Sequence, residues 1–132
     1  MIKNFEKYTH ELTDDEKVLL PQFINGLKTK IGKQNAVSNK HIRSRFKTIN
    51  VNVSDARVRK IINHIRINNL LPLLCSNSKG YFVARNIDEI EEYLKGLQQR
   101  ISAQVKVHEA ISLQLEFKEL SKQIKLKNEK SI

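Results

Sequence analysis

The chain has 132 residues, of which 39% are hydrophobic and 29% charged, and its formal net charge is +10. This composition is typical of one globular domain, or of one domain with an appendage, and it excludes a collagen-like or compositionally disordered chain. No apolar run approaches the roughly 20 residues that a membrane-spanning helix needs, and the first ten residues lack the apolar stretch of a signal peptide. We therefore expect no membrane partner. Cys75 is the single cysteine, so we also expect no intrachain disulfide and a reducing cytoplasmic compartment.

The positive charge is concentrated in the middle of the chain. Residues 1–35 carry a net charge of +1, and residues 86–132 are neutral. Residues 36–85 hold ten Lys or Arg side chains and one acid, Asp55, and therefore carry +9. A basic block between two neutral flanks indicates a surface for a polyanion more specifically than a globally basic composition does.

The first predicted helix follows residues 1–12, which we expect to be loosely ordered because they show no regular pattern. Thr13 followed by Glu16 is a capping-box signature and predicts a helix start. Gly32 predicts its end, and Pro21 within it predicts a kink or a short first segment. The predicted inward row of this helix is Val18 or Leu19, then Phe23, Leu27 and Ile31.

Two short basic helices come next, each with a serine N-cap that follows a valine. Ser38 predicts the start of one helix, and Ser54 predicts the start of a second helix over residues 54–68. The predicted inward rows are Ile42, Phe46 and Ile49 in the first, and Val58, Ile61, Ile62 and Ile65 in the second. Only the short turn 50–53 separates them, which predicts a helix-turn-helix arrangement.

A β-hairpin is predicted after these helices. Residues 73–75 and 81–84 are short β-prone runs on either side of the segment 76–80, where Gly80 can supply a positive φ. Lys79 then lies near the hairpin tip. The predicted fold class is mainly α with a small β-hairpin, and three helices followed by a hairpin over residues 13–85 is the element order of a winged helix-turn-helix domain.

The last part of the chain predicts a long helix over residues 86–117, with Asn86 as its N-cap and apolar residues at alternating spacings of three and four. Such a helix is about 48 Å long, so it either forms a coiled coil with a second chain or breaks and folds back. We favour self-association, and we expect residues 118–132 to fray. The predicted dimerisation residues are Ile90, Leu94, Leu97, Ile101, Ile111 and Leu115.

The exposed side of the predicted helix 54–68 suits the major groove of DNA. Arg and Lys donate to guanine and to phosphate, and Asn can pair with adenine. The amino end of the preceding helix suits phosphate. The candidate DNA-binding residues are Ser38, Asn39, Lys40, Arg43, Lys47, Arg57, Arg59, Lys60, Asn63, His64, Lys79 and Arg85. The alternative is a solvated basic face that binds nothing.

No motif supports catalysis. The four histidines are far apart and lack the spacing of metal ligands, and the acidic residues 88–92 suit a helix N-terminus. Cys75 fits a small buried hydrophobe, and phosphate-loop, dinucleotide and nucleophile-elbow motifs are missing. We therefore expect no enzyme, no metal and no cofactor. Because only 6% of the residues are aromatic, duplex DNA fits better than a single strand stacked on exposed rings.

The segments "VSNKHIRSRFKTI", "VSDARVRKIINHIR" and "LCSNSKGYFVA", within residues 13–85, resemble the winged helix-turn-helix superfamily. The segment "DEIEEYLKGLQQRI" resembles the extra C-terminal helix by which many members dimerise, and the chain is similar to small winged-helix proteins of bacteriophages and mobile elements of AT-rich bacteria. The resemblance implies sequence-specific duplex binding in the cytoplasm of a bacterial host cell. It assigns Lys79 to a wing contact and the following residues to base edges: Arg57, Arg59, Lys60 and Asn63. The tight "NVNV" turn and the short wing depart from the pattern.

Two functions stay open at this point. The first is a homodimeric DNA-binding protein, a transcriptional regulator or a replication accessory, that reads half-sites about 34 Å apart or a multiple of this distance. The second is a winged-helix module that binds another protein through its long, neutral C-terminal helix and does not bind DNA.

Overall fold

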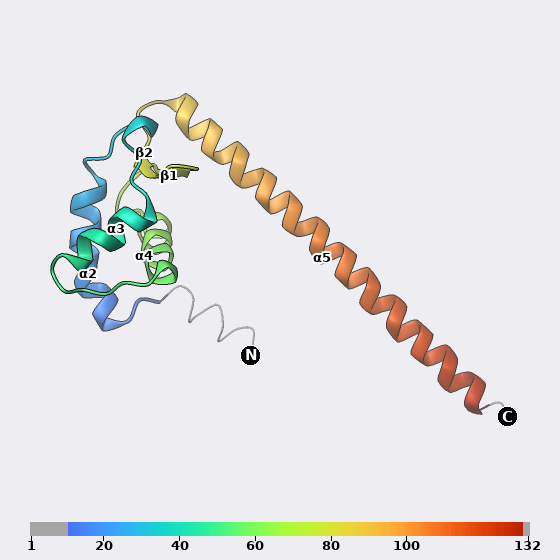
Figure 1. Ribbon diagram of the computed structural model, residues 1–132. Helices are drawn as coiled ribbons and strands as arrows, with labels where there is room; N and C mark the ends of the chain where they lie inside the picture. The colour runs from blue at the N-terminus through green and yellow to red at the C-terminus, as the bar shows by residue number, and fades with distance from the viewer. Residues whose placement is uncertain (1–10, 131–132) are drawn as a thin grey trace. The chain divides into compact units, whose positions relative to one another are not determined.

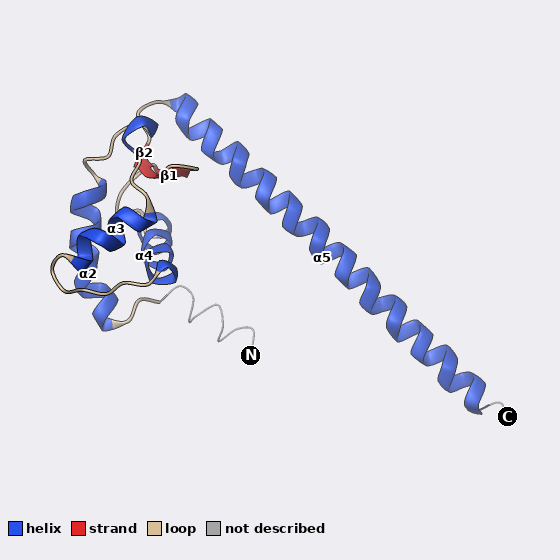
Figure 2. Ribbon diagram, viewed as in Figure 1, coloured by secondary structure: helices blue, strands red, loops and turns tan. Residues whose placement is uncertain are grey.

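The computed structural model describes residues 11–130, and the side chains of residues 11–126. The expectation for residues 1–10 lies outside this range. The elements in chain order are α2 (Asp14–Leu27), the short 3-10 helix η1 (Lys33–Asn35), α3 (Asn39–Lys47), α4 (Asp55–Ile67), β1 (Leu74–Asn77), β2 (Gly80–Val83) and α5 (Ile87–Lys130) (Figures 1 and 2). The prediction of a mainly helical chain with a small hairpin and a long last helix is confirmed. The chain divides into two compact units, Met1–Tyr93 and Leu94–Ile132.

The predicted N-caps of α2, α3 and α4 are confirmed. Thr13 and Glu16 form a complete capping box, in which each side chain accepts a hydrogen bond from the backbone N–H of the other residue. Ser38 and Ser54 each accept a hydrogen bond from the backbone N–H three residues further on. These bonds satisfy donors that a helix start leaves without an intrahelical partner.

The end of α2 differs from the prediction. The helix is continuous through Pro21 and ends at Leu27, five residues before Gly32. Ile31, predicted to continue the inward row, lies outside the helix and forms a β-bridge with Val83. The pairing with β2 therefore overrides the helical spacing of this residue.

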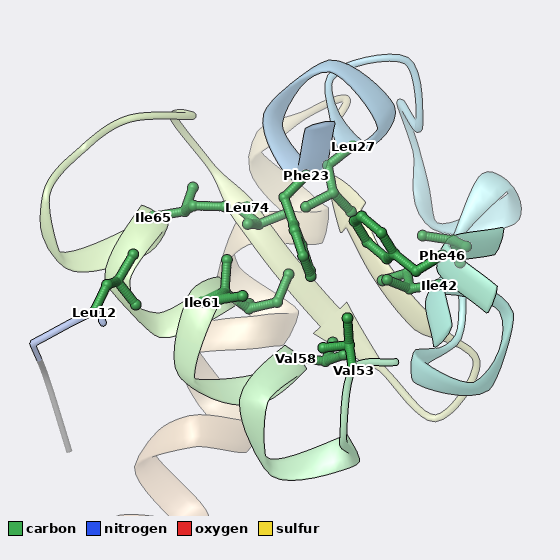
Figure 3. Close-up of a cluster of buried hydrophobic side chains, with 12 residues drawn as sticks. Leu12, Phe23, Leu27, Ile42, Phe46, Val53, Val58, Ile61, Ile65 and Leu74 are labelled. Atoms are coloured by element: carbon green, nitrogen blue, oxygen red, sulfur yellow. The ribbon is translucent and has the colours of Figure 1, made fainter. Parts of the chain in front are cut away.

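The core of the first unit lies between α2, α3 and α4 (Figure 3). The predicted inward row of α4 is confirmed, since its four residues are 0% exposed: Val58, Ile61, Ile62 and Ile65. Phe23 of α2 stacks on Phe46 of α3 with 5.0 Å between the ring centroids. This shared core fixes α3 against α4 and thereby the orientation of their outer faces.

Two residues near the edges of this core differ from their predictions. Leu12, assigned to a loosely ordered N-terminus, is buried in the core. Ile49, assigned to the inward row of α3, is 56% exposed. The helix ends at Lys47 and Asn50 adopts a φ of 61°, so the chain turns before Ile49 reaches the core and Val51 packs there instead.

The hairpin pairs β1 with β2 in an antiparallel register, with Asn77 opposite Gly80. The Asn77 side chain accepts hydrogen bonds from the backbone N–H groups of Lys79 and Gly80. Lys79 therefore lies at the predicted tip. Val37, just before α3, exchanges two backbone hydrogen bonds with Tyr81 at 2.8 and 2.9 Å, which ties the start of α3 to the hairpin.

The last helix, α5, is unbroken from Ile87 to Lys130. It therefore includes most of the segment 118–132 that was expected to fray; residues 131 and 132 lie outside the described range. Within residues 11–130, no helix is both long and apolar enough to cross a membrane.

Candidate nucleic-acid interface

A shallow groove of about 590 Å³ lies along α3, the turn after it and the start of α4. We call it the basic groove. Its lining residues are Lys40, Arg43, Ser44, Lys47, Val51, Asn52, Val53, Ser54 and Arg57. Four of them are cationic and none is acidic, so the groove attracts anions.

Three of these cations come from one face of α3. Lys40, Arg43 and Lys47 follow at intervals of three and four residues, which places them on the same side of a helix. The buried residues Ile42 and Phe46 hold the other side against the core. The short amphipathic pattern of α3 is therefore enough to direct all three cations outward.

Two cations are held in place by contacts with the protein. The Arg43 Nε donates to the Val53 carbonyl at 3.0 Å, which fixes its guanidinium beside the turn and leaves other N–H donors free. The Arg57 Nε lies 3.6 Å from a Glu16 carboxylate oxygen, and the Arg57 side chain is 48% exposed. Arg57 is also in the first turn of α4, where the helix dipole favours an anion.

Lys60 departs from its prediction. The helical wheel placed it on the exposed side of α4, but its ammonium lies 2.8 Å from Glu16 Oε1, and only 20% of its side chain is exposed. The packing of α2 on α4 brings the buried Glu16 to this position. Lys60 therefore neutralises a carboxylate of its own chain and is not available to a base edge.

The environment of Glu16 favours its charged form. Burial alone raises the pKa of this carboxyl, but the hydrogen bonds from Lys60 and from the Thr13 backbone N–H outweigh burial and hold the pKa below its ordinary value. Glu16 is thus a buried anion that binds two cations of α4.

The remaining predicted residues of α4 are either engaged in contacts with other side chains or partly buried. Arg59 pairs with Asp55 at 2.9 Å on the surface. Asn63 is exposed and accepts a hydrogen bond from Arg66 at 3.4 Å. His64 is half-buried. Ala56, Arg59 and Asn63 still leave an exposed side along α4.

Arg66 contributes to the stability of the hairpin and not to the basic groove. Its Nε donates to the Leu74 carbonyl at 2.9 Å and its guanidinium lies near the rings of Tyr81 and Tyr93, at 5.8 and 5.2 Å. This arrangement links α4, β2 and the first turns of α5.

The other four predicted DNA-binding residues lie outside the basic groove. The Ser38 hydroxyl serves as the α3 cap, and the Asn39 amide donates to the Asp55 carbonyl and the Tyr81 hydroxyl at 3.4 and 3.5 Å. Lys79 and Arg85 are exposed but do not line the groove. The structure thus brings together four of the twelve predicted residues, Lys40, Arg43, Lys47 and Arg57.

Sequence reasoning missed three polar residues of the groove, Ser44, Asn52 and Ser54. Asn52 and Ser54 were assigned only to the turn and the cap, although polar residues between two basic helices could have been predicted to share their surface. Ser44 could have been found by its place between Arg43 and Lys47.

The predicted dimerisation residues are in two different environments. Ile90 packs with Tyr93 against Cys75, Phe82 and Ala84 in the first unit, so it is not free for a second chain. The others lie in the second unit, where Leu97 is half-buried and four are 48–60% exposed: Leu94, Ile101, Ile111 and Leu115.

Comparison with known proteins adds no relative. No family model, no curated protein and no solved structure matches the chain. Among the residues that the structure describes, no group of three His, Cys, Asp or Glu side chains could hold a metal ion.

Proposed function

We propose that the chain is a winged helix-turn-helix protein that binds double-stranded DNA sequence-specifically, with α4 in the major groove. The observation that carries the proposal is the basic groove, in which four cations from α3 and α4 converge with no acid among the lining residues. The order α2, α3, α4 and hairpin, with Val37 bridged to the hairpin, supports the winged-helix assignment.

The cations of the groove fit phosphate contacts. Lys40 and Lys47 are exposed on α3, and Arg57 adds a guanidinium at the amino end of α4. Contacts of this kind position a protein on a duplex without reading its sequence. We assign to them most of the affinity and nearly all of its salt dependence.

The exposed side of α4 fits base contacts. Arg59 and Asn63 carry the donors and acceptors that can read guanine and adenine, and the small Ala56 allows close approach or contact with a thymine methyl. Lys60 drops out of this set because of its pair with Glu16. Arg59 must leave Asp55 or share it when it binds a base.

The hairpin fits a backbone contact only. Two residues, Ser78 and Lys79, form its tip between Asn77 and Gly80. A wing this short offers one cation, Lys79, and little reach into a minor groove.

The biological role that we propose is a transcriptional regulator or replication accessory of a phage or mobile element, acting as a homodimer in the bacterial cytoplasm. The exposed apolar residues of α5 support the dimer, since a second chain can cover them.

A charge reversal in the basic groove tests DNA binding. We expect Lys47→Glu to weaken binding to a fluorescently labelled duplex by at least about tenfold, and to reduce the slope of log K against log salt by about one unit. The matched control is Lys106→Glu, which reverses an exposed lysine in the second unit and should leave the affinity within about twofold. Equal affinities of the two variants on every duplex would refute the proposal.

Selection of binding sites from random duplexes tests specificity. Enrichment of one sequence supports base reading by α4, and Asn63→Ala should then relax the preference at one position. If no duplex shifts and the full chain instead retains an acidic protein, the protein-binding module is the better assignment.

A further inference from the structure

The second unit presents a helix whose large apolar side chains have no partner in the described chain. We propose that a second copy of α5 covers them in an antiparallel coiled coil centred on Lys106. This inference rests on the proposed self-association and is independent of DNA binding. It specifies the orientation and register that the dimer adopts.

The row of alternating three- and four-residue spacings begins apolar and ends basic. From Leu94 it runs through the following positions: Leu97, Ile101, Gln104, His108, Ile111, Leu115, Lys118, Lys122 and Lys125. In a parallel coiled coil each of these residues faces its own copy. The last three layers would then oppose lysine to lysine, which is unfavourable at such short separation.

An antiparallel pair centred on Lys106 removes this conflict. Residues at equal distances from Lys106 then face each other, so Leu97 lies opposite Leu115 of the partner. By the same rule Ile101 lies opposite Ile111. The apolar positions of one helix thus meet the apolar positions of the other.

The two polar positions of the row also meet each other. Gln104 and His108 are each two residues from Lys106, so they form a pair on either side of the centre. An amide and an imidazole can hydrogen-bond, whereas either one opposite Ile or Leu is left unsatisfied. A buried polar layer is a known way in which coiled coils fix their register.

Two further exposed valines are explained by this register. Val105 and Val107 are 48% and 62% exposed, and they lie one residue on each side of the centre. These valines flank the row and are not part of it. Val105 therefore approaches Val105 of the second copy, Val107 approaches Val107, and both cover the polar pair from the side. In a parallel pair, Val105 would instead lie beside Arg100 of the second copy.

The charges at the two ends of α5 are complementary. Asp88 and Glu91 in the first turns form no ion pair among the described residues. The antiparallel register lays the Lys118 stem of the partner over Leu94 and brings its ammonium near Glu91. Lys122 would face Ile90, which packs against the first unit, so the coiled coil ends at the Leu94 layer. A parallel pair gathers like charges at both ends.

A separate apolar row on α5 supplies a control. Leu113, Phe117, Leu120 and Ile124 repeat at spacings of four, three and four, but they project from a different side of the helix than the row described above. The proposed coiled coil leaves this second row uncovered. Phe117, which is 72% exposed, is therefore a residue whose replacement should not affect the dimer.

Disulfide trapping in the full chain tests the orientation. In a Cys75→Ala background, Leu97→Cys and Leu115→Cys are made separately, oxidised alone and oxidised as an equimolar mixture. We expect a covalent dimer only in the mixture. Cross-linking of either variant by itself, or no cross-linking in any sample, would overturn the register.

Sedimentation velocity tests the interface with a charge in the row. We expect Ile101→Glu to convert the dimer to monomers, with a shift in Kd of at least about 100-fold, while Phe117→Ser remains dimeric. A wild-type chain that is monomeric at about 100 times the concentration used for DNA binding, or a dimer that Phe117→Ser dissociates, would overturn the proposal. The salt titration on DNA tests the basic groove separately. A chain that forms no coiled coil can therefore still bind DNA as proposed, and a chain that does not bind DNA can still form the coiled coil.

Discussion

The two units of this protein differ in how they satisfy their apolar side chains. In the first unit the inward row of α4 is fully buried, and the hairpin and α2 close over it. In the second unit large aliphatic residues such as Leu113 and Leu115 remain 60% exposed or more. Both units have helical periodicity, but among residues 11–126 only the first unit packs several elements against one another.

This difference separates a domain with its own core from a helix whose large apolar side chains lie exposed. A helix with an exposed apolar row gains little stability from itself, because most helical stability in proteins comes from packing of the apolar face. The first unit can therefore position a site, and the second unit carries the exposed row that we propose a second copy covers.

Gly80→Ala should destabilise the first unit by about 3 kcal/mol. Gly80 has a φ of 140°, and a Cβ there would collide with the Val37 carbonyl group, which belongs to the backbone. Urea unfolding followed by tyrosine fluorescence measures the loss, since Tyr81 lies in β2. The second unit provides the contrast: a Cβ added to Gly96 would meet no heavy atom within 4 Å apart from the adjacent helix backbone and its chain neighbours, so Gly96→Ala should stabilise α5 by up to about 1 kcal/mol. Equal effects at both glycines would contradict the contrast.

Glu16→Gln should destabilise the first unit by about 2 kcal/mol, because it removes a buried anion that pairs with Lys60 and lies near Arg57. Asp15→Asn, at an exposed neighbouring position, should cost less than about 0.5 kcal/mol.

The pH dependence of unfolding tests the same carboxyl. The folded state holds the Glu16 pKa below its unfolded value, so it binds fewer protons than the unfolded chain. The stabilisation is then present above a pH of about 4.3 and is lost as the pH falls through the lower folded pKa. Glu89, whose pKa is lowered by hydrogen bonds from the backbone N–H groups of Arg85 and Lys33, adds a slope of the same sign. Glu16→Gln should therefore flatten the acid limb without abolishing it, and an unchanged slope would contradict the assignment.

Asp55→Asn should have the smallest effect on stability, within about 0.5 kcal/mol, because its pair with Arg59 is exposed. It should nevertheless strengthen DNA binding about threefold at low salt, since it removes a negative charge from the first turn of α4 and releases Arg59. Fluorescence anisotropy measures this gain. A weaker complex would indicate that Asp55 positions Arg59 for its contact.

Much of the fold could be predicted from local patterns. Ser38 and Ser54 cap helices because each cap hydrogen bond joins residues only three positions apart. Lys79 lies at the hairpin tip because Gly80 allows the tight turn between the two strands. The row of α4 was predictable for the same reason, since one periodic face needs only a partner surface. Ile31 and Ile49 were assigned incorrectly because the pattern continues past the point where the chain leaves the helix.

The candidate site was predictable only in part. Lys40, Arg43 and Lys47 lie on one face of one helix, so their spacing was enough to bring them together. Lys60 has the same chemistry and an outward place on its helical wheel, yet Glu16 lies 44 positions earlier in the sequence and becomes its partner only through the packing of α2 on α4.

The sequence by itself determined which faces of the short helices are apolar, where these helices begin and that positive charge is concentrated between residues 36 and 85. Local hydrogen bonds and helical periodicity depend on residues a few positions apart, so they can be read along the chain. Only the tertiary structure decided which cations remain available to a ligand, because a buried carboxylate from a distant helix neutralises some of them and leaves the others exposed. It also decided that Ile90 belongs to the first unit, since that depends on which surface lies next to it after folding.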